Sequence, residues 1–274
     1  MPVHKATMGD RAPGQAVIEE LLRQQLGRKP RSTLARFFGA SPLAAGSVSW
    51  YEGARGELIV GQILATLPDG WKAFHSLPIG TKGSDIDHMV VGPGGVFSIN
   101  TKHHNKKAVW VAGSTLMVSG QKQGHIRNAE FEAKRVTKLL RQRMPQIPAV
   151  QPVLVLVNPK SLTIKTKPER VTVIRATRLR RWLTERTSVF SETKLREITT
   201  VMDDPATWPS TALPSFSDSS ERFAELHHEV QRAQFRRRVW SFTCGLLLIA
   251  GAVLAGPPLL TALLGAYFRA VRFG

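Results

Sequence analysis

The sequence predicts an α/β domain with a mixed sheet flanked by helices, and three observations support this. Short β-branched and apolar runs alternate with longer segments of helical periodicity along residues 50–183. One of these runs, Pro152–Val157, is apolar at every position, as is typical of strands buried in the middle of a sheet. Two others flank Gly92-Pro93-Gly94-Gly95, whose turn chemistry predicts an antiparallel hairpin. Strands that alternate with helices indicate an α/β sandwich.

The individual elements follow from periodicity. Helices are expected where apolar residues recur three to four positions apart: 15–27, 52–67, 126–143 and from 179 to 183. Strands are expected in the short β-branched runs: 86–91, 96–101, 146–157 and 171–174. The predicted domain occupies 47–200 and follows a basic N-terminal extension over 1–46.

The hairpin places four polar residues on one face. If the turn is centred on Pro93-Gly94, Asp87 lies opposite Asn100 and Asp85 lies opposite Lys102, and alternation along a strand puts all four on the same side. Two neighbouring carboxylates repel each other, and a hard divalent cation with oxygen ligands relieves that repulsion. A nearby lysine can then orient water or stabilise developing negative charge. The alternative is a surface ion pair of Asp85 with Lys102, with Asp87 solvated.

Glu57 is a further acidic candidate. It shares the core-facing stripe of the 52–67 helix with Val60 and Leu64, where a carboxylate needs a partner. It could equally be a residue of the first helical turn, favoured by the helix dipole.

These residues resemble a known family. The motifs are Gly53-x-x-Gly56-Glu57, Trp71, His75, Ser84-Asp-Ile-Asp-His88, Gly92-Pro-x-Gly-Val-Phe97 and Ile99-Asn-Thr-Lys102. They occur in the order typical of the NERD (nuclease-related) domain, and the resemblance extends from about Trp50 to Leu183. That family is similar to the PD-(D/E)xK nucleases, which have a restriction-endonuclease-like core.

The resemblance implies a catalytic and metal-binding set. By position, Glu57, Asp87, Asn100 and Lys102 would surround a Mg²⁺ or Mn²⁺ ion, and Asp85 would be an additional metal ligand. Asn100 departs from the pattern, because the superfamily usually has an acidic residue there. An amide oxygen can bind Mg²⁺ but adds no negative charge. Asn128 lies near the place where several related nucleases have a glutamine.

The charge of the chain indicates a polyanionic partner. The formal net charge is +18 and the pI is about 10.9. Two strongly basic stretches, 102–143 and 160–186, follow the hairpin and could line a phosphate-binding groove, in which nucleic-acid contacts are predicted for Lys106, Lys107, Lys122 and Arg127. A solvated basic surface without a specific ligand is the alternative. Because Cys244 is the only cysteine, an intramolecular disulfide is excluded.

The C-terminal part predicts attachment to a membrane. A Pro/Ser-rich linker (201–220) precedes a basic amphipathic helix (221–238) and a predicted transmembrane segment (239–268). Trp240–Phe268 has no charged residue in 29 positions, more than the roughly 20 that a span requires. Pro257-Pro258 allows either one kinked span or a short hairpin, and a buried core helix is the alternative. The arginines at 236–238 predict a bacterial cell-membrane protein whose domain faces the cytoplasm.

Three functions remain open. The first is a membrane-anchored, metal-dependent phosphodiesterase acting on DNA. The second is a catalytically weak or inactive module that tethers nucleic acid to the membrane, which the neutral Asn100 favours. The third is a membrane-associated scaffold whose basic surface contacts anionic lipid.

Overall fold

The computed structural model describes residues 7–80, 84–209 and 218–272, without the side chains of 254–260 and 265–272. The chain forms two compact units. The first joins Met1–Gln24 to Gly46–Ser220, and the second joins Gln25–Ala45 to Glu221–Gly274.

The first unit alternates helices and strands as the sequence predicts. Its helices are α1 (Gln15–Gln25), α3 (Val48–Leu64), α4 (His125–Arg143), α5 (Ala176–Thr184) and α6 (Glu192–Asp203), with 3₁₀ turns at Met8–Asp10, Ala45–Ser47 and Pro205–Thr207. Its strands are β1 (Lys72–Pro78), β2 (Asp85–Gly92), β3 (Gly95–His103), β4 (Ala108–Ala112), β5 (Thr115–Val118), β6 (Gln121–Gln123), β7 (Gln151–Val157), β8 (Ser161–Thr166) and β9 (Thr172–Arg175).

Five strands form the predicted mixed sheet, in the order β1-β2-β3-β7-β9. β1, β2 and β3 are antiparallel, and β7 and β9 add to β3 in parallel. The register aligns Lys102 of β3 with Leu156 of β7 and Arg175 of β9. The predicted mixed α/β fold is therefore confirmed.

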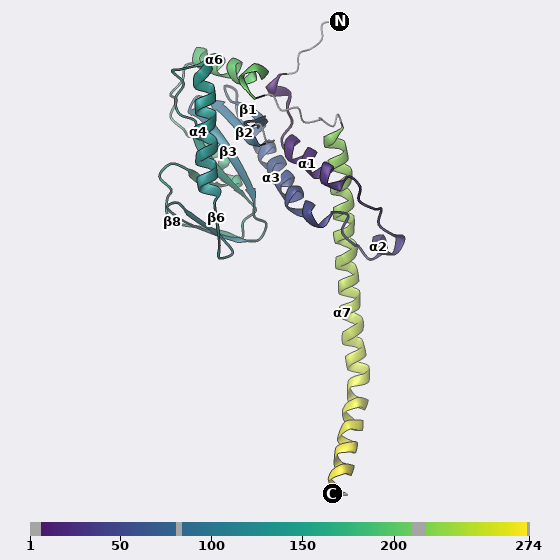
Figure 1. Ribbon diagram of the computed structural model, residues 1–274. Coiled ribbons are helices and arrows are strands. Elements are labelled where there is room, and N and C mark those ends of the chain that lie inside the picture. The colour runs from purple at the N-terminus through teal and green to yellow at the C-terminus, as the bar shows by residue number, and fades with distance from the viewer. Residues whose placement is uncertain (1–6, 81–83, 210–217, 273–274) are drawn as a thin grey trace. The chain divides into compact units, whose positions relative to one another are not determined.

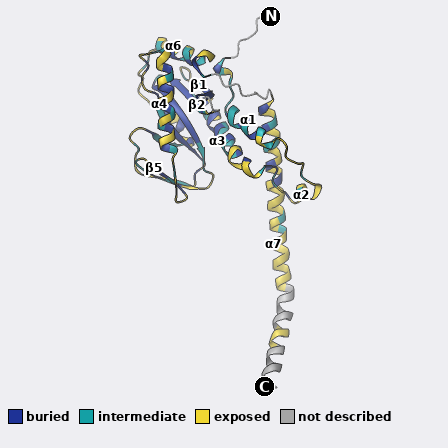
Figure 2. Ribbon diagram, in the orientation of Figure 1, coloured by how far each residue is buried: buried dark blue, intermediate teal, exposed yellow. Residues whose placement is uncertain are grey.

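Helices cover both faces of this sheet, and its central strands are buried (Figures 1 and 2). On one face, Val60 and Leu64 of α3 and Leu179 of α5 pack against apolar residues of β3 and β7. On the other face, Val136 of α4 and Ile198 of α6 pack against β1 and β2. The polar end of the β2–β3 hairpin lies between α3 and α4, so this layering decides which helices can reach it.

A second sheet, in the order β6-β5-β4-β8, was not predicted. Its strands are three to six residues long, and one of its faces is buried and includes Val109, Val111 and Leu116. These side chains pack against Ile126 of α4 and Leu156 of β7. Strands this short show little periodicity of their own, because their stability depends on this packing.

The β2–β3 hairpin has the predicted register. Val91 pairs with Val96 and Gly92 with Gly95, so the loop is Pro93-Gly94. Gly95 has φ +139°, a conformation that only glycine adopts readily. The turn chemistry therefore sets which side chains of the two strands face each other.

The second unit consists of α2 (Thr33–Phe37) and the long helix α7 (Ser219–Arg272). The rings of Phe37 and Phe38 pack on Trp240, whose indole N–H donates to the carbonyl oxygen of Phe37. Arg31 forms an ion pair with Glu229. Aromatic packing and this polar contact hold the α2 segment on α7.

The predicted transmembrane segment over 239–268 is not supported. In the described part of the chain, no helix is long and apolar enough to cross a membrane.

Candidate functional site

Asp87 lies where the β2–β3 ladder ends. The pairing stops at His88 and Ile99, and the Thr101 N–H of β3 then donates to Oδ2 of Asp87 at 2.6 Å. Burial raises the pKa of Asp87, while the Lys102 ammonium and the Thr101 amide oppose this. The predicted position of Asp87 opposite Asn100 is one step beyond the last ladder pair. Here the Asp87 carboxylate, rather than a backbone group, accepts the hydrogen bond from β3.

Asp85 is the second carboxylate of β2 and pairs with Pro78 on the β1 side. Its partly buried side chain has its pKa raised to about 7, by burial first and then by Asp87. No ion pair joins Asp85 to Lys102 among the described residues. The alternative of a surface ion pair with Asp87 solvated is therefore wrong.

Glu57 reaches the same carboxylates from α3. It is buried, and its pKa is raised well above the ordinary value by burial, then by Asp87 and Asp85. α3 begins at Val48, so Glu57 lies in the middle of the helix and the helix-start alternative is wrong. Gly56 permits the close approach of α3, because a Cβ there would lie 3.0 Å from Cβ of His103 on β3.

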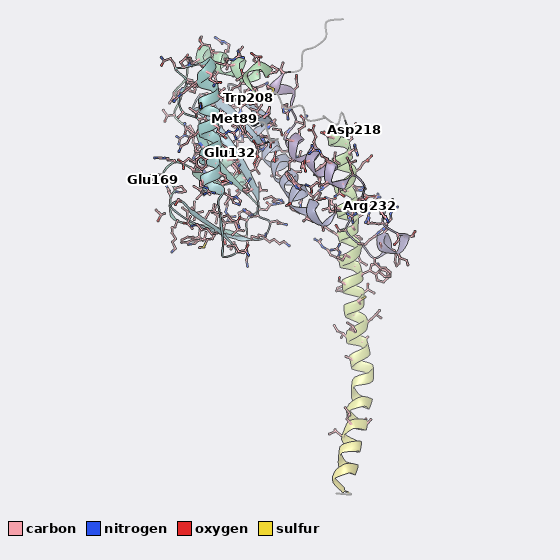
Figure 3. The ribbon with its side chains drawn as sticks, in the orientation of Figure 1. Met89, Glu132, Glu169, Trp208, Asp218 and Arg232 are labelled. Carbon is pink, nitrogen blue, oxygen red and sulfur yellow. The ribbon has the colours of Figure 1, made fainter. Side chains whose placement is uncertain are left out.

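Glu132 of α4 completes the group, and sequence reasoning missed it (Figure 3). The side-chain N–H groups of buried Asn100 donate to both Glu132 carboxylate oxygens, at 3.0 and 2.8 Å. Burial raises the pKa of Glu132 to about 7, with Asp87 adding to the effect. A signal was present, since Glu132 follows Ala129 by three positions on the buried stripe of α4. Asn128 is exposed.

Lys102 is the cation that acts on three of the four carboxyls. Its ammonium donates to the Thr101 carbonyl oxygen at 3.1 Å and lowers the pKa values of Glu57, Asp87 and Glu132. Arg11 also lowers the pKa of Asp85 and Arg135 that of Glu132, so three cations act on four carboxylates and the group still carries excess negative charge whenever the acids are ionised. The raised pKa values express this repulsion together with burial.

Three buried oxygens of the group have no hydrogen-bond partner within the described structure: Glu57 Oε2, Asp85 Oδ2 and Asn100 Oδ1. An unpaired buried oxygen is costly, and a hard cation satisfies it. The donor chemistry therefore fits Mg²⁺ or Mn²⁺. Among the described residues, however, no three His, Cys, Asp or Glu side chains lie close enough together to hold a metal ion as they stand.

Two histidines lie near Lys102. The rings of His104 and His125 stack with centroids 5.4 Å apart, and each Nε2 is buried without a partner in the described structure. Burial lowers the pKa of each to about 4, and Lys102 contributes in both cases. The preceding His103 points elsewhere, with Nδ1 2.8 Å from Glu52 on α3. His103, the last residue of β3, and His104, the first residue after it, therefore have different partners.

The residues predicted to contact nucleic acid are all exposed. Lys106 and Lys107 lie in the turn after β3, Lys122 lies on β6, and Arg127 lies in the first turn of α4. Lys107 contributes to the lowered pKa of His104, so its charge lies near the histidine pair. Their contact with nucleic acid remains a prediction.

Comparison with known proteins identifies the segment that carries these residues. Residues 52–157 match the family model described as nuclease-related domain (NERD). This range contains Glu57, Asp85, Asp87, Asn100, Lys102 and Glu132. No curated protein and no solved structure matches the chain significantly.

Proposed function

We propose that this chain, whose residues 52–157 match the nuclease-related domain, is a metal-dependent phosphodiesterase acting on DNA. The observation that carries the proposal is the group of four carboxylates around Lys102, in which Glu57, Asp85 and Asn100 each have an unpaired buried oxygen. A structural role does not explain this group, because buried acids without partners destabilise a fold.

Each residue then has a chemical task. The oxygens of Glu57, Asp85, Asp87 and Asn100 would hold Mg²⁺ or Mn²⁺, which supplies Lewis-acid stabilisation and a more acidic bound water. Lys102 orients the attacking water and stabilises the negative charge that develops on the phosphate.

Glu132 supports this arrangement from α4. By accepting both hydrogen bonds of the Asn100 amide, it leaves Asn100 Oδ1 free to act as a ligand. It also adds the negative charge that an asparagine at position 100 lacks. His104 and His125 are neutral donors near Lys102 that suit a phosphate oxygen.

A second candidate is a catalytically weak module that binds nucleic acid. The observation in its favour is the neutral Asn100 in the metal-binding set, since loss of one charged ligand lowers the affinity for a divalent cation. The net charge of +18 suits both candidates.

The test is incubation of the full-length protein with linear, nicked and single-stranded DNA, with and without Mg²⁺ or Mn²⁺. Cleavage that requires the metal and is lost in Asp87→Asn supports the enzyme. DNA binding without cleavage, equal for the parent and Asp87→Asn, supports the binding module. Lys165→Ala, which removes an exposed lysine of β8, is the control for nonspecific loss of charge.

A further inference from the structure

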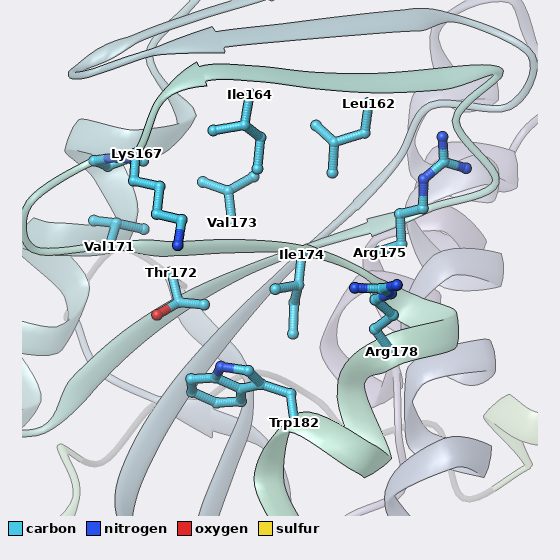
Figure 4. A pocket seen from close by; sticks show the side chains of 11 residues that line it. Leu162, Ile164, Lys167, Val171, Thr172, Val173, Ile174, Arg175, Arg178 and Trp182 are labelled. Carbon is cyan, nitrogen blue, oxygen red and sulfur yellow. The ribbon is translucent and has the colours of Figure 1, made fainter. Parts of the chain in front are cut away.

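A groove lies between two strand edges, at the far end of the mixed sheet from β1 (Figure 4). β9 is the last strand of the five-stranded sheet and β8 the last strand of the four-stranded sheet. β9 pairs with β7 alone and β8 with β4 alone, so within the described structure one edge of each strand has no neighbouring strand. Such edges present unpaired backbone N–H and C=O groups to an incoming chain.

The walls of the groove are apolar on both sides of β9. Leu162 and Ile164 project from β8 toward Val173, whereas Ile174 lies on the same side of β9 as the Trp182 ring of α5 (Figure 4). Ile164 is 38% exposed, so this apolar wall is partly open to solvent. The volume is about 850 Å³, within the range of natural ligand sites.

The charged residues of the groove all have the same sign. Lys167, Arg175 and Arg178 are among its eleven described lining residues, and none of these eleven is acidic. Arg178 is exposed and has no ion pair in the described structure. A second copy of this chain is a poor occupant, because each copy carries a net charge of +18.

We infer that the groove binds an extended acidic peptide of a partner protein, which adds a strand to the open edge of β9. The backbone of the peptide would pair with Thr172–Arg175. Its side chains would alternate between the Leu162–Ile164 wall and the Trp182 wall, because successive residues of a strand point to opposite faces. Its carboxylates would meet Lys167, Arg175 and Arg178. Nucleic acid suits the charge, but it has no peptide N–H and C=O groups to pair with the edge of β9 and no aliphatic side chains for the Leu162–Ile164 wall.

The test is selection of a display library of random heptapeptides on the full-length protein, with Ile164→Glu as the counter-selection. The expected peptides alternate apolar with acidic residues. Their affinity, measured by fluorescence anisotropy, should fall about tenfold or more in Ile164→Glu and in Arg178→Glu, as for loss of a central interface residue. Lys165→Glu makes a matched change of charge on β8, outside the groove lining, and should alter affinity less than about twofold.

A second measurement distinguishes the occupants. Hydrogen exchange at Thr172–Arg175 should slow when a selected peptide is added. The inference is overturned if no peptide is enriched over Ile164→Glu, or if the selected peptides bind equally to Arg178→Glu. It is also overturned if an oligothymidylate protects these amides and displaces the peptide, since the occupant would then be nucleic acid.

Discussion

The side-chain amide of Asn100 donates two hydrogen bonds to the carboxylate of Glu132, at 3.0 and 2.8 Å. These bonds join β3 to α4 at the group of acids around Lys102. They place a negative charge beside the position at which the resemblance to nucleases leads one to expect an acid. We therefore expect the strand residue and the helix residue to act as one unit.

Substitutions that exchange the acid and the amide between positions 100 and 132 test whether the two residues act together. Glu132→Gln removes a negative charge from the site and should reduce the rise in melting temperature that Mg²⁺ or Mn²⁺ produces, because a cation that binds more weakly stabilises the folded state less. Asn100→Asp alone should raise metal affinity but lower metal-free stability, since two carboxylates then face each other. Asn100→Asp with Glu132→Gln keeps one acid and one amide and should restore parent-like behaviour. An unchanged metal response in Glu132→Gln would remove Glu132 from the site.

Lys102→Ala should separate binding from catalysis. Its proposed role lies in the transition state, so turnover should fall by about 10²-fold or more, while the metal-dependent shift in melting temperature stays within about a factor of two. Asp87→Ala is the matched comparison, because it should abolish both responses. Equal loss of metal binding in the two variants would contradict this assignment.

Asp85 and Glu132 should make the metal-free protein less stable as pH rises from about 4 to 7, whereas His104 and His125, whose pKa values burial lowers to about 4, act in the opposite direction. Burial raises the pKa values of Asp85 and Glu132 to about 7 in the folded state, against about 4 in the unfolded chain, so the folded state binds more protons in this window. The contribution is present below pH 4 and is lost as pH rises through 7. Melting scans over this range should show a steeper fall, or a smaller rise, of the melting temperature in the parent than in Asp85→Asn, because the histidines are common to both. A melting temperature that rises with pH, in the parent but not in this variant, would be inconsistent with the raised pKa.

Replacing Lys106, Lys107 and Lys122 together with alanine should weaken DNA binding. The slope of log affinity against log salt should become shallower by about one unit for each lysine that no longer neutralises a phosphate. The matched control replaces three lysines outside both basic stretches, namely the exposed Lys29 and Lys72 and the partly exposed Lys194. Equal effects of the two triple variants would indicate a solvated basic surface without a defined groove.

Gly56→Val should displace Glu57 although Gly56 itself is not a site residue. A Cβ at this position would lie 3.0 Å from His103 Cβ and 3.3 Å from Thr101 Cγ2, so α3 must move away from β3 and take Glu57 with it. We expect a loss of about 1–3 kcal/mol in unfolding free energy, as for overpacking elsewhere, together with a weaker metal response. Gly53→Ala in the same helix is the control, because its Cβ meets Val17 at an ordinary 3.4 Å and alanine favours helix.

The sequence by itself determined the hairpin and most of the secondary structure of the mixed sheet. Gly92-Pro93-Gly94-Gly95 places Val91 opposite Val96, and alternation then assigns each side chain to a face. These are local effects of turn geometry and of the two-residue repeat, so no knowledge of distant residues is needed. The apolar run of β7 and the long periodicity of α4 are equally local signals.

Only the tertiary structure decided which helices reach the hairpin. Glu132 lies 32 residues after Asn100, and whether the two meet depends on how α4 packs against the sheet. The same holds for the stacked His104 and His125, and for the second sheet, whose short strands form against α4 and β7. These groups meet because packing buries apolar surface over the whole domain. The sequence of a single segment does not show which other segments pack against it across the core.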